Sequence, residues 1–213
     1  MPINVIAHDI RLEGRTPLST SGSISFQVDE HTRMREFIAH TLEIANEHNG
    51  IGILYIMAHG LTIRDERTSA IQFTGDLISF RTIHMFRQLR DKIDRIILFV
   101  CHAAETDLTE FGDGDELCRY MAMNAHAEVT AARESQAYLR VEDCRLFSCE
   151  EAAIEFGQWE GPVVVYDRNG MIIARYNNPS VWHDSDGVMH DPRVDPNPHP
   201  YRDGEGARHA TRH

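Results

Sequence analysis

The residues best suited to catalysis in this sequence are His59 and Cys101. Each follows an apolar run, which extends from Ile51 to Ala58 before the histidine and from Arg95 to Val100 before the cysteine. A thiol of ordinary acidity is only slightly ionised at neutral pH, and a neighbouring imidazole can take its proton as the sulfur attacks a carbonyl carbon. The pair therefore predicts a cysteine–histidine dyad, with Cys101 as the nucleophile and His59 as the base.

Gly60 follows the histidine directly and could serve the same reaction. A glycine lets the substrate backbone approach closely, and its N–H can donate to an oxyanion. We therefore expect the backbone N–H groups of Gly60 and Cys101 to hold the oxyanion. His102 is a weaker candidate for the base, because adjacent strand residues point to opposite faces and its ring would not easily reach the sulfur.

The elements that must position the dyad predict an α/β fold. A continuous apolar run without alternation is typical of a strand buried on both faces of a parallel sheet. The segment from Ser79 to about Ile93 has apolar residues at helical spacing and the length of a crossover helix. Functional groups collect at the carboxyl ends of strands in such a sheet. If the two strands are neighbours, His59 and Cys101 emerge side by side.

The remaining pattern completes a largely parallel sheet with helical connections. Further strands are predicted at 3–10, 23–28 and 128–138, with a hairpin formed by 163–166 and 171–176 and another over 61–79 that turns at Thr74-Gly75-Asp76. Helices are predicted at 32–48, at about 117–125 and, from the capping box that begins at Ser148, at 148–156.

The composition divides the chain into a domain, residues 1–176, and a tail, residues 177–213. The 37 residues of the tail hold five of the eight prolines and only eight apolar residues. So little apolar surface cannot offset the entropy cost of ordering. We therefore expect a mobile or loosely docked tail.

Length and charge limit the classes of function. The 213 residues suffice for one domain with a proper core. A net charge of −12 repels phosphate and no concentrated basic patch offsets it, so no nucleic-acid partner is expected. No apolar run approaches the roughly 20 residues that span a bilayer, and the first residues lack the pattern of a signal peptide. We expect a cytoplasmic protein without a membrane partner, whose four cysteines are thiols.

A hydrophobic strand ending in His59-Gly60, a helix, and a hydrophobic strand ending in Cys101 together resemble the caspase–hemoglobinase fold. This group includes caspases, gingipains, separase, legumain, CHAT domains and the cysteine protease domains of bacterial toxins. The stretch from Gly114 to Ala131 resembles the helix and substrate-lining strand that follow the catalytic cysteine in CHAT-like members. The resemblance covers roughly residues 34–138. It implies a three-layer α/β/α sandwich with a largely parallel central sheet and a cysteine endopeptidase acting on protein or peptide substrates.

The resemblance also implies a substrate pocket lined by the strand after the third helix. Its candidates are Arg133, Glu134 and Ser135. Arg133 would favour an acidic P1 side chain and Glu134 a basic one. We favour Glu134 narrowly, because the chain as a whole is acidic.

Two other functions remain open from the sequence. Val100 is bulkier than the small residue usual before the nucleophile, and no glycine follows Cys101 closely, which favours a pseudopeptidase that acts as a binding or sensor module. A small thiol hydrolase or acyltransferase that uses the same dyad on a non-peptide ester is the third hypothesis. Nothing in the sequence indicates the oligomeric state.

No cofactor and no metal is expected for the reaction. Asp184-Ser185-Asp186-Gly187 begins like a calcium loop but lacks the bidentate glutamate that should follow. Relatives activated by calcium keep calcium activation open. Cys144 and Cys149 are not expected to form a zinc site, because four converging ligands cannot be assembled around them.

Overall fold

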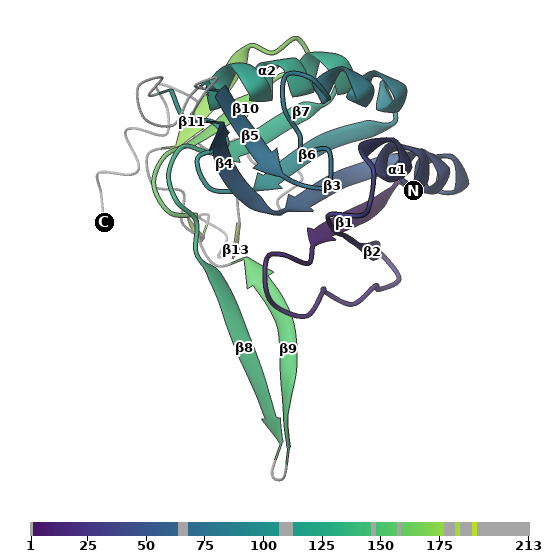
Figure 1. Cartoon of the computed structure of the whole chain (residues 1–213), viewed down its shortest axis with the longest axis vertical. Coiled ribbons are helices and arrows are strands. Elements are labelled where there is room, and N and C mark those ends of the chain that lie inside the picture. The colour runs from purple at the N-terminus through teal and green to yellow at the C-terminus, as the bar shows by residue number, and fades with distance from the viewer. Residues whose placement is uncertain are drawn as a thin grey trace.

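A seven-stranded sheet forms the centre of the computed structural model, which describes residues 2–63, 68–106, 113–145, 148–156, 159–176, 182–183 and 189–190 (Figure 1). The strand order is β11-β10-β7-β6-β3-β1-β2. The strands are β1 (Ile3–Asp9), β2 (Ser23–Val28), β3 (Ile51–Met57), β6 (Ile93–Phe99), β7 (Glu128–Ala132), β10 (Val163–Tyr166) and β11 (Ile172–Tyr176). The first five run parallel, β10 runs antiparallel to β7, and β11 runs antiparallel to β10. The prediction of an α/β fold with a largely parallel sheet is confirmed.

The two apolar runs before His59 and Cys101 form neighbouring strands, β3 and β6, near the middle of this sheet. Their side chains are buried on both faces. Leu54 and Ile56 of β3 belong to the core on one face, whereas Ile53 and Tyr55 belong to the core on the other. Burial on both faces explains why these runs are apolar without alternation.

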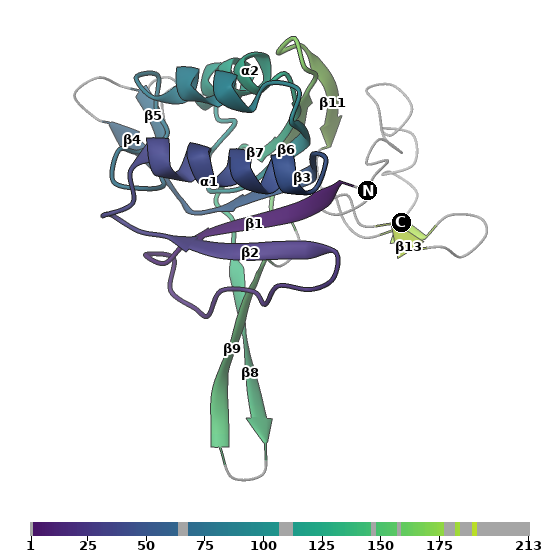
Figure 2. The ribbon, with the colours of Figure 1, turned by 90° about the vertical axis from the view of Figure 1, so that its right-hand side faces the viewer.

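The helical segments described in this chain cover one face of the sheet (Figure 2). They are α1 (Met34–Glu47), the 3-10 helix η1 (Ile83–Leu89) and α2 (Gly114–Ala125). Phe37 of α1, Phe86 of η1 and Met121 of α2 are fully buried in this core. The predicted crossover over 79–93 therefore exists, but its helical part is a short 3-10 helix.

Loop and hairpin residues cover the opposite face instead of helices. Leu12, Ile154 and Trp159 pack there against Phe99 and its neighbours. The second helical layer of the expected three-layer sandwich is not found among the described residues. One cause is the segment 148–156, which was expected to be a helix and is the strand β9 (Ser148–Phe156).

β9 pairs with β8 (Tyr138–Arg145) in an antiparallel hairpin that extends away from the body of the protein (Figure 1). The capping-box prediction is wrong because this pairing replaces the helical hydrogen bonds. The strand predicted over 128–138 is also too long. It stops at Ala132, and a loop over 133–137 leads into the hairpin.

A second hairpin leaves the sheet directly at the candidate base. It consists of β4 (His59–Ile63) and β5 (Thr68–Gln72). A hairpin was predicted over 61–79 with its turn at Thr74–Asp76. The observed hairpin pairs His59–Ile63 with Thr68–Gln72, so both of its strands precede that turn. That later turn is closed by a single bridge between Ile71 and Ile78.

Only two short strands of the tail are described, β12 (Trp182–His183) and β13 (Met189–His190), which pair with each other. The calcium-like segment Asp184–Gly187 lies outside the described residues. No helix among the described residues is both long and apolar enough to cross a membrane.

Candidate active site

The ends of β3 and β6 bring His59 and Cys101 to the same edge of the sheet. Met57 pairs with Phe99 in the parallel ladder, so His59 and Cys101 each lie two residues beyond the same pair. The chain segments that carry them remain in contact after the ladder ends. A Cβ atom built on Gly60 would lie only 1.9 Å from the carbonyl oxygen of Cys101. The adjacency expected from the sequence is therefore found in the backbone.

The order in which strands are added to the sheet changes between β1 and β3: β2 lies on one side of β1, whereas β3, β6 and β7 follow one another on the other side. His59 lies at this reversal of strand order, just beyond the end of β3. Ligands of open α/β sheets bind outside the carboxyl ends of the strands at such a reversal. The His59 ring is exposed, and its Nε2 lies 3.4 Å from the carbonyl oxygen of Arg11, just beyond the end of β1. A carbonyl oxygen only accepts, so this contact places the ring proton on Nε2 and leaves the lone pair on Nδ1.

The half-buried Cys101 thiol contacts the loop that follows β7. Its Sγ accepts a hydrogen bond from the backbone N–H of Gln136 at 3.2 Å. The same sulfur lies 3.6 Å from the Gln136 carbonyl oxygen, to which the S–H can donate. These two contacts fix the sulfur against the loop.

The Gln136 side chain holds that loop in place. Its Nε2 donates to the carbonyl oxygens of Glu134, Ser135 and Glu160 at 3.1, 2.8 and 2.7 Å, and its Oε1 accepts from the Glu160 N–H at 3.0 Å. Gln136 is 7% exposed, so these bonds are shielded from water. Gln136 could not be predicted from the sequence, because a single glutamine in a loop has no local pattern that marks it.

Tyr138 ties the start of the β8–β9 hairpin to the end of β6. Its hydroxyl donates to the carbonyl oxygen of Phe99, the last residue of β6. Burial raises the pKa of Tyr138 well above its ordinary value, and the nearby Cys101 adds to the rise. The phenol therefore stays protonated and serves as a fixed donor between the site and the β8–β9 hairpin.

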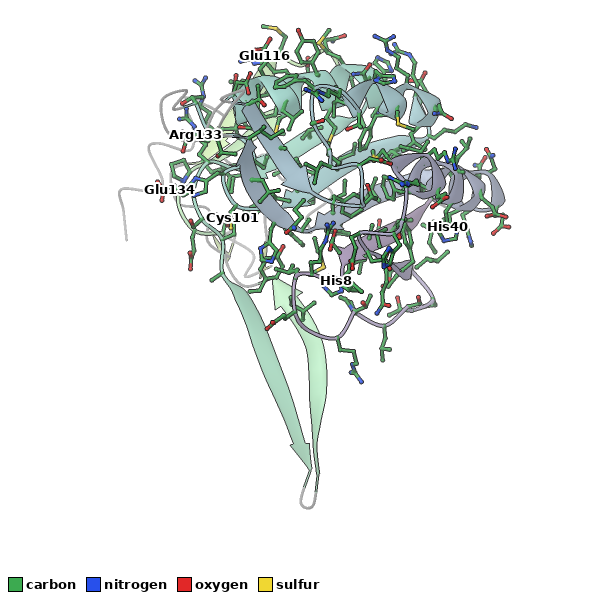
Figure 3. All side chains as sticks on the ribbon, in the orientation of Figure 1. His8, His40, Cys101, Glu116, Arg133 and Glu134 are labelled. Carbon is green, nitrogen blue, oxygen red and sulfur yellow. The ribbon has the colours of Figure 1, made fainter. Side chains whose placement is uncertain are left out.

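The three predicted substrate residues occupy the loop after β7, and not a strand. Strand alternation therefore does not decide which of them faces a substrate. The Arg133 guanidinium donates to the Thr106 hydroxyl, and a Cβ atom on Gly161 would lie 2.5 Å from the Glu134 carboxylate. Cys101, Arg133 and the exposed Glu134 lie on the same side of the molecule in Figure 3.

Ser135 bonds a residue from the turn after β6. The Oγ of Ser135 lies 3.0 Å from Nε2 of His102. The N–H of His102 donates to the Glu134 carbonyl oxygen at 3.0 Å, so the turn after β6 and the loop after β7 are joined along their length.

The other three cysteines lie in elements other than the turn that carries Cys101. Cys118 is buried in α2, where its thiol donates to the Ala103 carbonyl oxygen and burial raises its pKa. Cys144 and Cys149 occupy directly opposed positions of the β8–β9 ladder. Within the described part of the chain, no group of three histidine, cysteine or acidic side chains is placed to hold a metal ion.

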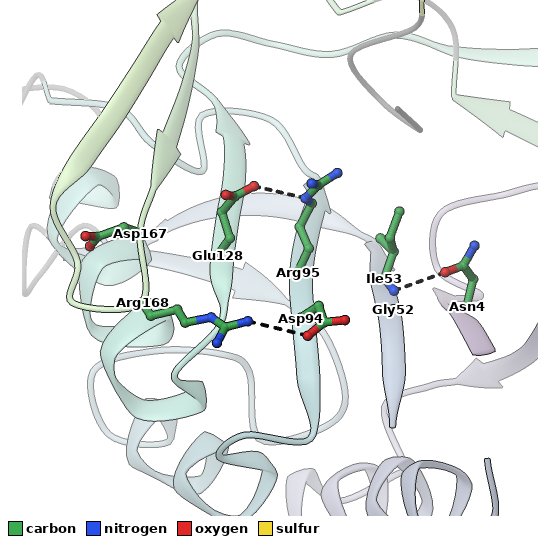
Figure 4. Close-up of a pocket in the computed structure, with 8 residues that line it drawn as sticks. All are labelled: Asn4, Gly52, Ile53, Asp94, Arg95, Glu128, Asp167 and Arg168. Atoms are coloured by element: carbon green, nitrogen blue, oxygen red, sulfur yellow. Dashed lines mark hydrogen bonds and ion pairs between the residues drawn. The ribbon is translucent and has the colours of Figure 1, made fainter. Parts of the chain in front are cut away.

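An open pocket of about 620 Å³ lies at the opposite edge of the sheet (Figure 4). It is lined by residues at the starts of the parallel strands and in the β10–β11 turn. Two ion pairs occupy its wall, Arg95 with Glu128 at 2.9 Å and Arg168 with Asp94 at 3.4 Å. Because the parallel strands separate it from His59 and Cys101, this pocket is not part of the dyad site.

No known protein-family model matches the chain, and no curated protein matches its sequence. What the site can do must therefore be judged from its own residues.

Proposed function

We propose that this protein is a cysteine endopeptidase in which Cys101 is the nucleophile and His59 is the base. The observation that carries the proposal is the meeting of two neighbouring parallel strands, which places the backbone of Gly60 directly against that of Cys101. The position at the reversal of strand order adds support. A caspase–hemoglobinase-like fold is part of the same proposal, and the mostly parallel α/β sheet is compatible with it.

The reaction follows from the groups at the strand ends. The Cys101 sulfur attacks the peptide carbonyl carbon as its proton passes to Nδ1 of His59, while the N–H groups of Gly60 and Cys101 donate to the oxyanion. The C–N bond then breaks, and the leaving amine takes the proton from His59. Water attacks the thioester, gives one proton to His59 and releases the acid. The sulfur finally recovers that proton.

The loop after β7 is the natural wall for the substrate side chain, because Gln136 of this loop contacts Cys101. The guanidinium of Arg133 already donates to Thr106, whereas the Glu134 side chain is exposed. These contacts favour Glu134 as the group that selects the substrate. A peptide with lysine or arginine at P1 is therefore the proposed substrate.

A pseudopeptidase is the second candidate. The observation that favours it is that the two dyad side chains bond other groups: His59 contacts the Arg11 carbonyl and Cys101 contacts Gln136. In that case the thiol would not be activated, and the loop would present a binding surface.

Labelling with peptidyl chloromethyl ketones tests the choice. A ketone with lysine at P1 is expected to alkylate Cys101, at least tenfold faster than one with aspartate at P1, and the His59→Ala variant is expected to react at least tenfold more slowly. His84→Ala is the control, because His84 is exposed on η1, in the helical layer that covers one face of the sheet. Equal labelling of His59→Ala and the wild type would favour the pseudopeptidase.

A further inference from the structure

A second set of neighbouring side chains, Ser135, His102 and Glu105, lies next to the Cys101 site and takes no chemical step in the reaction proposed above. The His102 ring stands between the other two. Its Nε2 lies 3.0 Å from the Ser135 Oγ, and its Nδ1 lies 3.7 Å from Oε2 of Glu105. A hydroxyl, an imidazole and a carboxylate in this order are the parts of a serine nucleophile with its base and supporting acid.

The backbone fixes the tautomer that such a centre needs. Nδ1 of His102 lies 3.2 Å from the carbonyl oxygen of Arg133. Because that oxygen can only accept, Nδ1 of the neutral ring carries the proton and Nε2 carries the lone pair. Nε2 therefore accepts from the Ser135 hydroxyl, which is the direction of proton transfer in general-base catalysis.

Glu105 is placed to stabilise the ring after it has taken the proton. The Glu105 and His102 side chains are only 16% and 26% exposed, so water screens their attraction less than at an open surface. The N–H of Thr106 donates to the other carboxylate oxygen at 2.6 Å and helps to fix the group.

The backbone of His102 adds an independent observation. Its φ angle is 53°, in the left-handed region that residues other than glycine seldom adopt. Two hydrogen bonds hold the turn in this conformation, from the His102 N–H to Glu134 and from the Ala104 N–H to Ala132, at 3.0 and 2.8 Å. A backbone conformation of this kind persists only where surrounding contacts hold it in place, and such conformations are frequent at functional sites.

We propose that Ser135, His102 and Glu105 form a second acyl-transfer centre, which hydrolyses carboxylic esters. Ser135 is exposed, so an ester can reach its hydroxyl. Ser135 Oγ attacks the ester carbonyl while its proton passes to Nε2 of His102, and the departing alkoxide takes that proton as the alcohol leaves. Water then attacks the acyl-serine, gives a proton to Nε2 and releases the acid, and Ser135 recovers its proton.

The test uses the full chain carrying Cys101→Ala, so that the thiol cannot contribute. A fluorophosphonate probe is expected to form an adduct at Ser135, located by peptide mass spectrometry. Hydrolysis of p-nitrophenyl acetate is expected to fall at least tenfold in Ser135→Ala and in His102→Gln. Glu105→Gln is expected to lower it several-fold. Ser21→Ala is the matched control, because Ser21 is also exposed, and it should leave both signals unchanged.

Thermal unfolding of each variant separates loss of the centre from loss of the fold. Ser135 is an exposed loop residue, so Ser135→Ala should unfold near the temperature of its parent. The absence of a Ser135 adduct in the folded parent would overturn the proposal. An adduct that forms equally fast in His102→Gln would overturn it as well, because the Ser135–His102 bond would then only hold the loop. Either result leaves the Cys101 proposal untouched.

Discussion

Gly60 and Cys101 touch through their backbones: a Cβ atom at position 60 would lie 1.9 Å from the Cys101 carbonyl oxygen and 2.9 Å from its carbonyl carbon. The contact joins the segment that carries the candidate base to the segment that carries the candidate nucleophile. Because backbone atoms occupy the space, no side-chain rearrangement can make room for a larger residue at position 60.

Gly60→Ala should therefore destabilise the protein by about 1–3 kcal/mol, the usual range for an overpacked position. It should also lower the rate at which Cys101 is alkylated by the P1-lysine ketone, because the two strand ends are forced apart. Urea unfolding measures the first effect and mass spectrometry the second. Gly22→Ala is the control, since nothing lies within 4 Å of a Cβ atom there. Equal stability of the two variants would refute the close contact.

Gln136 should matter more for stability than its place in a loop suggests. Gln136→Ala removes four side-chain hydrogen bonds, and the free energy of unfolding is expected to fall by about 2–4 kcal/mol, at roughly 0.5–1 kcal/mol for each bond. Gln136→Glu should be worse at pH 7, because a carboxylate would face three carbonyl oxygens that the amide now donates to. Gln88→Ala, at an exposed position, should change stability little. If Gln136→Glu were as stable as the wild type, the described bonding of the loop would be wrong.

The strands that position the dyad could be predicted from the sequence, because the signal lies within each strand's own residues. A strand buried on both faces has to be apolar throughout, and 51–58 and 95–100 satisfy that condition. The turn at Asp167–Gly170 likewise predicted the β10–β11 hairpin. Once β3 and β6 are known to be neighbours, the meeting of Gly60 with Cys101 follows.

Features that depend on contacts between segments far apart in the sequence could not be predicted. Ser148 and Glu151 fit a helix start, and the following alanines favour a helix, yet pairing with β8 makes the segment a strand. The bond between His102 and Ser135 joins residues 33 positions apart. It depends on how the turn after β6 meets the loop after β7, and no spacing in the sequence encodes that.

His8 should make stability depend on pH. It is fully buried on β1, with its ring bonded to Thr16 and Leu12, and burial lowers its pKa below the ordinary value of about 6.5. The unfolded chain therefore binds a proton more readily than the folded one. The stability that the neutral ring contributes is complete above pH 6.5 and is lost as the pH falls through the lower, folded-state pKa.

Urea unfolding between pH 5 and 7.5 measures this effect. The free energy of unfolding of the wild type should decrease toward pH 5, and His8→Gln should show a flatter dependence in spite of lower overall stability. His31→Gln is the control, because 85% of the His31 side chain is exposed. The same slope in His8→Gln and the wild type would assign the pH dependence to other groups.

Glu134 should set the preference for the residue at P1. Glu134→Gln is expected to reduce cleavage after lysine and arginine at least tenfold, mainly through KM, because an exposed carboxylate is lost from the loop that contacts Cys101. Arg133→Gln should change this preference little, since its guanidinium is engaged with Thr106. The opposite ranking of the two variants would reverse the assignment and indicate an acidic P1 residue.

Cleavage of a proteome-derived peptide library, read by mass spectrometry, tests the dyad most directly. Wild type, Cys101→Ala and His59→Ala are compared, each with and without added calcium. We predict new peptide ends, most of them after lysine or arginine, in the wild type alone. Peptide ends that are equally abundant in Cys101→Ala, or no cleavage by the wild type under either condition, would contradict the assignment of Cys101 and His59 as the catalytic pair of a peptidase.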